Sequence, residues 1–143
     1  MRFNGEWQIS VDGITRPIIR AEILTGSGDW WGLDMLVDSG ADRTVINKQT
    51  LDRLSLESFP SKHQLGGVGG RVSSIEIRTQ LQLFQEDGQG TVFNGSYAAF
   101  LEDEALDMSV LGRDVLDLLV LILDRPKDVV ALLGGNHTYT ITP

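Results

Sequence analysis

The segment VDSGADRTVI, residues 37–46, decides how this chain folds. Asp38 follows an apolar, strand-like run that ends at Val37, and a stretch of small residues comes directly after it. The pattern predicts a buried strand that delivers a carboxylate into a tight turn, where an unpaired charge is costly. The segment occurs once in the chain, so any carboxylate partner of Asp38 has to come from elsewhere.

Length and composition indicate one globular domain that spans residues 1–143. Hydrophobic residues make up 41% of the chain and charged residues 22%, which are ordinary values for a folded domain. The formal net charge is 12 − 20 = −8, and the basic residues are scattered, so we expect no nucleic-acid partner. The absence of cysteine excludes disulfides, thiolate metal sites and cysteine nucleophiles.

The amino terminus lacks the apolar core of a secretory signal. The strongest apolar run, residues 118–123, is too short to cross a bilayer. From these two observations we expect a cytoplasmic protein that has no membrane association.

Alternating apolar residues and frequent turn signals predict a chain made mostly of β-strands. The expected strands are residues 17–24, 30–37, 71–84 and 91–101, a hairpin of 120–124 and 128–133, and a last strand at 137–142. Asn47 can cap one or two helical turns within residues 47–56. Residues 113–119 are predicted to form the one clear helix.

Several other roles for Asp38 can be weighed on the residues alone. Asp34, Asp38 and Asp42 would form a metal-binding face on a helix, but Gly40 and the β-branched surroundings oppose a helix there. The segment does not match a calcium loop, and Ser39 lacks the preceding glycine of a nucleophile elbow. A carboxylate that caps a turn is the common role of such a short motif.

Two further segments bear on the choice. In LGGVGGRV, residues 65–72, four glycines surround one apolar residue: Gly66, Gly67, Val68, Gly69 and Gly70. A hairpin turn needs fewer glycines, so the excess indicates a mobile tip whose backbone approaches a ligand. The dinucleotide and Walker spacings are absent. In SVLGRDVL, residues 109–116, Arg113 follows an apolar pair and a glycine, which by itself indicates only a helix start.

Together and in this order, the three segments resemble the retropepsins, the homodimeric aspartic proteases of retroviruses and their cellular relatives. The matching motifs are LVDSGADRT, LGGVGG and VLGRD, and RPIIRAEI looks like the strand that precedes the active site in that family. The resemblance covers most of residues 16–119. It implies an all-β fold, a small closed β-barrel with one short helix, that is active as a symmetric homodimer.

The resemblance also implies a role for each residue of the first motif. Asp38 would be the catalytic carboxylate, and Ser39 would form a hydrogen bond across the paired loops of the dimer. Gly40 would let those loops approach, and Ala41 would pack beneath them.

A second group of residues would support the loop or bind substrate. Asp42 would form a buried ion pair with Arg113, and its free oxygens would contact the substrate backbone. The alternative is an ion pair on the surface, which would stabilise the fold by under about 1 kcal/mol. Val68 would lie at the tip of a flap, residues 65–72, and reach substrate through a water molecule. Arg43 would line a substrate pocket, where its charge could favour acidic or polar side chains.

The chemistry that the resemblance implies needs two carboxylates, and the chain has one D-S-G motif. A two-fold symmetric dimer would bring Asp38 of each copy to the axis. The two groups would share one proton, so one could activate a water molecule while the other protonates the scissile carbonyl. We therefore expect an endopeptidase that hydrolyses extended peptide or protein substrates without a metal or an organic cofactor.

The end of the chain departs from the viral pattern. Residues after the predicted helix look like those of cellular relatives, in which strands after the helix form the dimer contacts, so interdigitated termini are not expected. Because it has its own Met1, we expect the chain to be complete, and self-excision is not expected as its main task. His63 and His137 are interpreted as ordinary polar residues.

Two other hypotheses stay open. The chain could be a non-catalytic peptide-binding or dimerisation module that keeps the retropepsin fold, or a β-barrel in which the motifs occur by chance. The intact Asp38, Ser39 and Gly40 favour catalysis over a binding module, and a monomeric state would favour the chance match.

Overall fold

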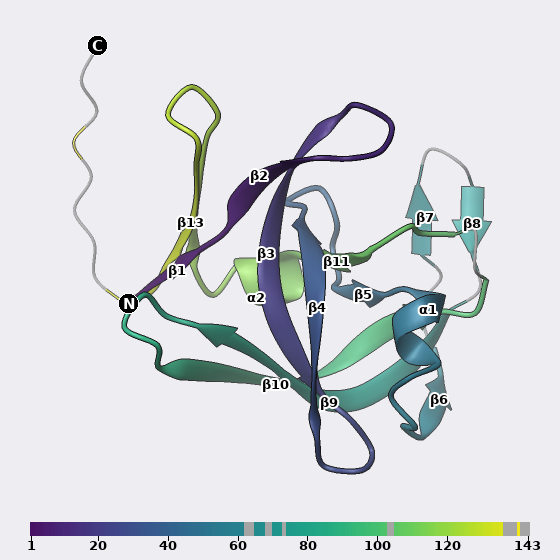
Figure 1. Ribbon diagram of the computed structural model, residues 1–143. Coiled ribbons are helices and arrows are strands. Elements are labelled where there is room, and N and C mark those ends of the chain that lie inside the picture. Colours follow the sequence, from purple (N-terminus) through teal and green to yellow (C-terminus); the bar gives the residue numbers. More distant parts are fainter. Residues whose placement is uncertain (62–64, 68–69, 73, 103–104, 136–139, 141–143) are drawn as a thin grey trace.

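The computed structural model describes residues 1–61, 65–67, 70–72, 74–102, 105–135 and 140 (Figure 1). The described strands are β1 (Arg2–Asn4), β2 (Glu6–Ile9), β3 (Thr15–Leu24), β4 (Trp30–Val37), β5 (Val45–Ile46), β6 (Ser58–Pro60), β7 (Leu65–Gly67), β8 (Gly70–Val72), β9 (Ser74–Phe84), β10 (Gly90–Phe100), β11 (Ser109–Leu111), β12 (Val120–Asp124) and β13 (Val129–Leu133). The described helices are α1 (Lys48–Leu51) and α2 (Arg113–Leu116). The chain is therefore all-β with short helices, as the sequence predicted.

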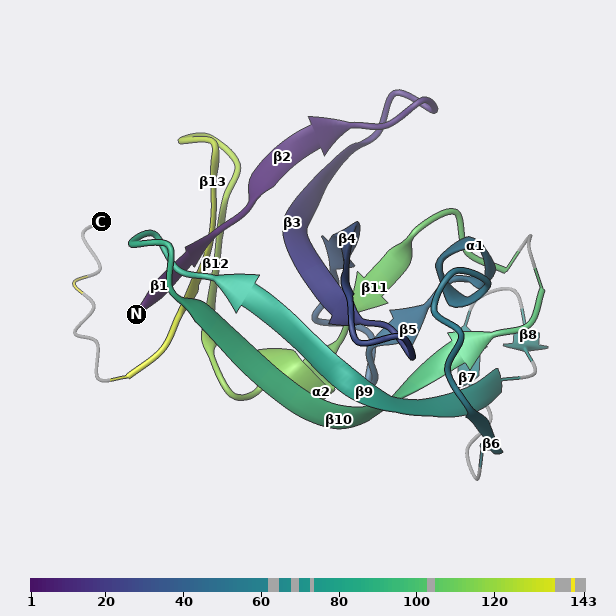
Figure 2. The same cartoon turned by 60° about the horizontal axis from the view of Figure 1, so that its bottom comes forward.

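The largest sheet closes on itself. Its strand order is β2-β3-β4-β11-β5-β10-β9-β6, and β3 also pairs with β9. That extra pairing, Glu22 with Gln82 and Ile23 with Leu81, joins β3, β4, β11, β5, β10 and β9 into a closed barrel of six strands. Figures 1 and 2 show β9 and β10 as one long antiparallel ribbon beneath the other strands. The predicted closed β-barrel is confirmed.

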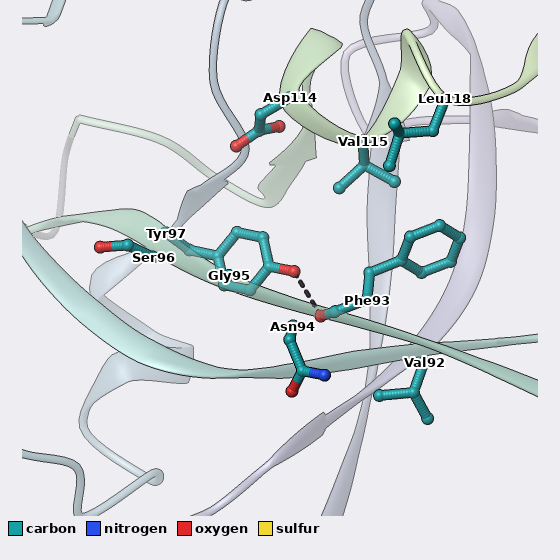
Figure 3. Close-up of a pocket in the computed structure, with 9 residues that line it drawn as sticks. All are labelled: Val92, Phe93, Asn94, Gly95, Ser96, Tyr97, Asp114, Val115 and Leu118. Carbon is teal, nitrogen blue, oxygen red and sulfur yellow. Dashed lines mark hydrogen bonds between the residues drawn. The ribbon is translucent and has the colours of Figure 1, made fainter.

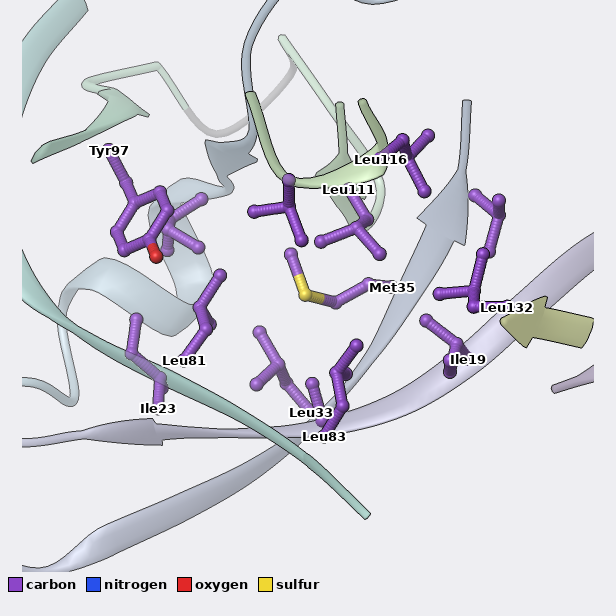
Figure 4. Packing of buried hydrophobic residues seen from close by; sticks show 14 of the residues in the cluster. Ile19, Ile23, Leu33, Met35, Leu81, Leu83, Tyr97, Leu111, Leu116 and Leu132 are labelled. Atoms are coloured by element: carbon purple, nitrogen blue, oxygen red, sulfur yellow. The ribbon is translucent and has the colours of Figure 1, made fainter. Parts of the chain in front are cut away.

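The barrel interior is filled by the apolar face of each strand. In β4, Leu33, Met35 and Val37 alternate inward and are buried, as period-two patterning requires. Figure 4 shows Met35 among side chains from β3, β9, β11 and β13, including Ile19. Each buried aliphatic side chain contributes about 1.5–3 kcal/mol relative to an exposed one. The strand that ends at Asp38 is therefore firmly fixed in the core.

A smaller sheet of order β1-β13-β12 lies beside the barrel. Its β12–β13 hairpin is the one predicted around residues 125–128, and the buried Phe3 of β1 joins the sheet to the main core. The strand predicted at 137–142 lies outside the described residues apart from Thr140, which is not in a strand.

The two helices are each a single turn. Asn47 caps α1 as predicted, and its side chain accepts a hydrogen bond from the Thr50 amide at 3.2 Å. The helix predicted at 113–119 ends at Leu116, because the next residues form tighter turn bonds, from the Leu119 amide to the Leu116 carbonyl at 3.0 Å, before β12 begins. Among the described residues, no helix has the length and apolar character needed to cross a membrane.

Candidate active site

The site is built on the loop that follows β4. Strand β11 runs parallel to β4 and pairs Leu111 with Val37, and the Asp38 amide donates to the Leu111 carbonyl at 3.1 Å. The Gly40 amide donates to Asp38 Oδ1 at 2.9 Å, and the Ala41 amide donates to the Asp38 carbonyl at 3.2 Å. Asp38 therefore caps its own turn, so the structural role weighed in the sequence is present.

The cap uses only one of the two oxygens of the Asp38 carboxylate. The described residues offer its second oxygen, Oδ2, no hydrogen bond. Asp38 is half-buried, whereas Ser39 and Gly40 beside it are exposed. One fixed oxygen and one open oxygen, on an exposed loop held by a rigid strand, are a suitable arrangement for a group that exchanges a proton with a bound molecule.

A hydrogen-bond network that the sequence did not predict holds the other side of this loop. The amide and the hydroxyl of the buried Thr44 both donate to Asp114 Oδ1, at 2.9 and 2.6 Å. The Gly112 amide in turn donates to Thr44 Oγ1 at 3.1 Å, and the Arg113 amide donates to the Ala41 carbonyl at 2.9 Å. A Cβ at Gly112 would overlap the Arg43 carbonyl, so only glycine lets the two segments meet.

Asp42 and Arg113 form the predicted ion pair, and a guanidinium nitrogen of Arg113 donates to Asp42 Oδ1. The expected burial is wrong for a single copy of the chain, because the side chain of Asp42 is 77% exposed and that of Arg113 is 47% exposed. Solvent reaches both groups in an outer part of the loop. In one copy the pair therefore contributes at most about 1 kcal/mol to stability.

The guanidinium of Arg43, which was predicted to line a substrate pocket, is paired within the chain. Its Nη1 donates to Glu76 Oε1 at 3.0 Å, and its Nη2 donates to the Ser96 carbonyl at 2.9 Å. The Ser96 hydroxyl completes a triangle by donating to Glu76 Oε2 at 2.9 Å. The side chains of Arg43 and Glu76 are only 19% and 20% exposed, so the cation is neutralised inside the chain rather than presented alone to a ligand.

The glycine-rich segment forms the predicted hairpin in its described backbone. Strands β7 and β8 are antiparallel, with Leu65 opposite Val72 and Gly67 opposite Gly70, and they form a sheet of their own. The predicted tip residues Val68 and Gly69 lie outside the described residues, as do His63 and His137. In the chain, β7 follows β6 and β8 precedes β9, and Glu76 lies near the start of β9. The bond between Arg43 and Glu76 therefore links the Asp38 loop to the strand that follows this hairpin.

A pocket of about 400 Å³ lies between β10 and α2 (Figure 3). Phe93, Tyr97, Asp114 and Val115 are among its lining residues, and the Tyr97 hydroxyl donates to the Phe93 carbonyl at 2.6 Å. Burial, together with the charge of Asp114, raises the pKa of Tyr97 to about 12, so this phenol is neutral at physiological pH. The pocket shares Asp114 with the Thr44 network but contains no residue of the Asp38 turn.

The described residues include no group of three or more acidic or histidine side chains arranged to hold a metal ion. The carboxylates nearest to Asp38 in sequence are already engaged, because Asp34 pairs with Arg20 at 3.2 Å and Asp42 pairs with Arg113. The metal-binding face weighed for Asp34, Asp38 and Asp42 is excluded by the extended backbone of β4 and by these ion pairs.

Comparison with known proteins shows which family sequence model the chain matches and which solved structures share its fold. Residues 9–115 match the sequence model of a family described as aspartyl protease. EIAV protease in complex with the inhibitor HBY-793 has a similar structure, with a TM-score of 0.53 at 23% identity over 76% of this chain and 92% of that one. A retropepsin-like aspartic protease from Rickettsia conorii gives a TM-score of 0.52 at 18% identity over 92% of this chain and 88% of that one. No curated protein matches the sequence significantly.

Proposed function

This chain belongs to the aspartyl protease family and has the retropepsin-like fold, and from that premise we propose that it is an endopeptidase in which Asp38 is the catalytic carboxylate. The observation that carries the proposal is the state of the Asp38 carboxylate. One oxygen is fixed by the Gly40 amide, the other has no hydrogen bond within the described residues, and the loop around it is exposed. The family is shown by a match over residues 9–115, which include Asp38, Asp42 and Arg113.

A second copy of the chain would supply the other half of the site. The two remaining Asp-Gly pairs, Asp12-Gly13 and Asp87-Gly88, lie in hairpin turns, and each of these aspartates bonds to an amide two residues further on. The exposed Ser39 and Gly40 leave room for an identical loop to approach, as a two-fold axis requires. In this dimer, Ser39 would bond across the axis.

The proposed reaction uses the two Asp38 carboxylates as one proton-sharing pair. Like charges a few ångström apart cannot both ionise, so one Asp38 is protonated and the other is a carboxylate. The carboxylate takes a proton from a water molecule, which attacks the carbonyl carbon of the scissile peptide. The protonated partner donates its proton to the carbonyl oxygen, and collapse of the tetrahedral species passes a proton to the leaving nitrogen. No metal or organic cofactor takes part.

The remaining residues of the proposal bind and position the substrate. An extended peptide would form main-chain hydrogen bonds under the flap, whose backbone is supplied by Gly66, Gly67, Val68, Gly69 and Gly70. Asp42, held by Arg113, has oxygens that face solvent and can accept amide protons of the substrate. Arg43 and Glu76 would present a neutral, paired wall to a substrate side chain.

The test compares the wild-type chain with Asp38→Asn on a mixed peptide library at several pH values, with pepstatin as an inhibitor control. We expect cleavage by the wild type and a loss of at least about 10²–10⁴-fold in the variant, the range that general acid–base catalysis supplies. Asp34→Asn is the matched control, because it changes the same functional group at an exposed position of β4, the strand that precedes Asp38, and it should retain activity.

Two outcomes would overturn the proposal. Cleavage retained by Asp38→Asn would remove Asp38 from the mechanism. A folded, dimeric wild type that cleaves no peptide at any pH would favour a non-catalytic module that binds peptides or only dimerises.

A further inference from the structure

The turn between β2 and β3 exposes an unusual amount of apolar surface. Val11 is fully exposed, Ile9 is 76% exposed and Ile14 is 54% exposed. Val11 and Ile9 are the two most exposed large hydrophobic residues in the described part of the chain. We call residues 9–14 the hairpin tip. A cluster of exposed aliphatic side chains commonly marks an interaction surface.

The hairpin tip has a defined internal structure. The Ser10 amide donates to the Ile14 carbonyl at 2.9 Å, and the Gly13 amide donates to the Ser10 carbonyl at 2.9 Å, with Gly13 in the left-handed region at a φ of 80°. Asp12 accepts a hydrogen bond from the Ile14 amide at 3.0 Å. The fixed turn therefore holds its apolar side chains in solvent, an arrangement that lowers the entropic cost of binding a partner.

An ion pair fixes the base of the tip. Both terminal nitrogens of the Arg16 guanidinium donate to the Asp12 carboxylate, at 3.2 and 2.7 Å. This bond lowers the pKa of Asp12. The ion pair adds to the backbone bonds that hold the turn.

The sheet register places the hairpin tip beside Asp38. The pairing of β3 with β4 ends at Ile18 and Leu36, two residues before Asp38, and β3 continues from there toward Arg16 in its pairing with β2. The tip begins where β2 pairs Ile9 with Thr15, beyond the end of β4. Figure 1 shows this turn at the same end of the molecule as the loop between β4 and β5. The apolar tip and the half-site of Asp38 thus share one end.

We propose that the hairpin tip is a dimerisation arm, in which Ile9, Val11 and Ile14 pack against a second copy of this chain beside the paired Asp38 loops. The inference rests on the proposed function in one respect, namely that a second copy completes the catalytic pair. A copy that brings its own Asp38 to within a few ångström of this Asp38 must cover the adjoining surface, and the tip is the apolar part of it. A second copy therefore fits the tip better than an unrelated partner does.

The test measures self-association without any substrate. Val11→Asp places a charge at the centre of the proposed contact, and Val92→Asp is the matched control, because Val92 is 41% exposed on β10 and lies in another part of the sheet. We expect sedimentation equilibrium to give a dimer dissociation constant at least about tenfold higher for Val11→Asp than for the wild type. Val92→Asp should equal the wild type.

A second measurement keeps the proposal falsifiable if Val11→Asp misfolds. The chain has no cysteine, so Val11→Cys and Val92→Cys each carry a single reactive thiol. A thiol-attached photo-cross-linker, which needs no particular partner group, should join two copies from position 11 and not from position 92, and equal cross-linking from both positions would overturn the proposal.

The outcomes separate this inference from the proposed activity. Equal dimer affinity for Val11→Asp and the wild type, or a wild type that stays monomeric at about 100 µM, would overturn the dimerisation arm. An intact Val11→Asp dimer with weakened peptide binding would assign the tip to the substrate instead and would also overturn it. A weakened Val11→Asp dimer supports the arm even if the wild type cleaves no peptide, in which case only the proposed function fails.

Discussion

At the scale of single residues, the side chain of Thr44 joins the Asp38 loop to the start of α2. Its hydroxyl donates to Asp114 and accepts from the buried Gly112 amide, so it satisfies one acceptor and one donor at once. Thr44 is completely buried, and no water can replace the hydroxyl without rearrangement of the loop. A change at this position therefore tests how strongly the loop depends on α2.

We predict that Thr44→Val lowers the free energy of unfolding by about 1–3 kcal/mol, because it leaves the Gly112 amide without an acceptor in the interior. Thr44→Ser keeps the hydroxyl and should cost less than half as much. Urea denaturation of both variants measures the difference. Thr44→Val keeps the methyl group and loses the hydroxyl, whereas Thr44→Ser keeps the hydroxyl and loses the methyl group. Destabilisation by Thr44→Ser as large as that by Thr44→Val would therefore contradict the prediction that the hydrogen bonds dominate.

The sequence identified Asp38 and the Asp42–Arg113 pair because each lies inside a short motif with a recognised spacing. The Thr44–Asp114 bond could not be predicted in the same way, because no motif assigns a partner to either residue, and the pairing of β4, β11 and β5 brings them together. The partner of Arg43 could not be predicted either, because Glu76 lies in no recognisable sequence motif. Periodicity places Glu76 in a strand but gives no indication of the strand that faces it.

At the scale of elements, alternation predicted the strands well and helix length poorly. Strands β3, β4 and β9 bury mainly alternate residues, so period two appears in their sequences, whereas β10 buries four consecutive residues at its end. The length of the helix predicted at 113–119 was overestimated, because Leu118 and Leu119 continue the apolar pattern of the helix. Strand β12 begins at Val120, and its pairing with β13 requires the chain to turn first.

The Arg43–Glu76–Ser96 triangle is the link between elements that is best suited to measurement. It joins the loop after β4 to β9 and β10 at low exposure, so its charges interact more strongly than those of a surface pair. We predict a coupling free energy of about 1 kcal/mol in a double-mutant cycle of Arg43→Met and Glu76→Gln.

The control for this cycle is the ion pair of Arg125 and Asp128 in the turn between β12 and β13. Arg125 Nη1 lies 3.6 Å from Asp128 Oδ1, and both side chains are largely exposed. Its coupling should stay below about 0.5 kcal/mol. Both cycles are measured by urea denaturation at the same ionic strength. If the two pairs coupled equally, the triangle would contribute no more to stability than an ordinary surface contact.

At the scale of the whole molecule, the proposed function assigns half of a catalytic site to one copy of the chain. The barrel fixes Asp38 through a strand buried in the core, yet Ser39, Gly40 and the ion pair of Asp42 all face solvent. The apolar hairpin tip lies beside them. A second copy that covers this end of the molecule would explain together why the Asp38 loop, the Asp42–Arg113 pair and the hairpin tip are exposed.

Subunit mixing tests this explanation through activity. If each active site needs Asp38 from two copies, a wild-type subunit paired with an Asp38→Asn subunit forms a dimer with one carboxylate and no proton-sharing pair. After exchange with a ninefold excess of the variant, about one wild-type subunit in ten has a wild-type partner. We therefore predict that cleavage per wild-type subunit falls about tenfold in the mixture.

The control is the same excess of an unrelated protein, which should leave activity unchanged, and substrate is kept in large excess over total protein so that binding by the variant cannot deplete it. Activity is followed over time after mixing, because exchange requires the dimers to dissociate first. A slow fall to the predicted level supports shared sites. Activity that stays proportional to the wild-type subunit alone after prolonged incubation would mean that one chain carries a complete site, and the second carboxylate would then have to be sought within it.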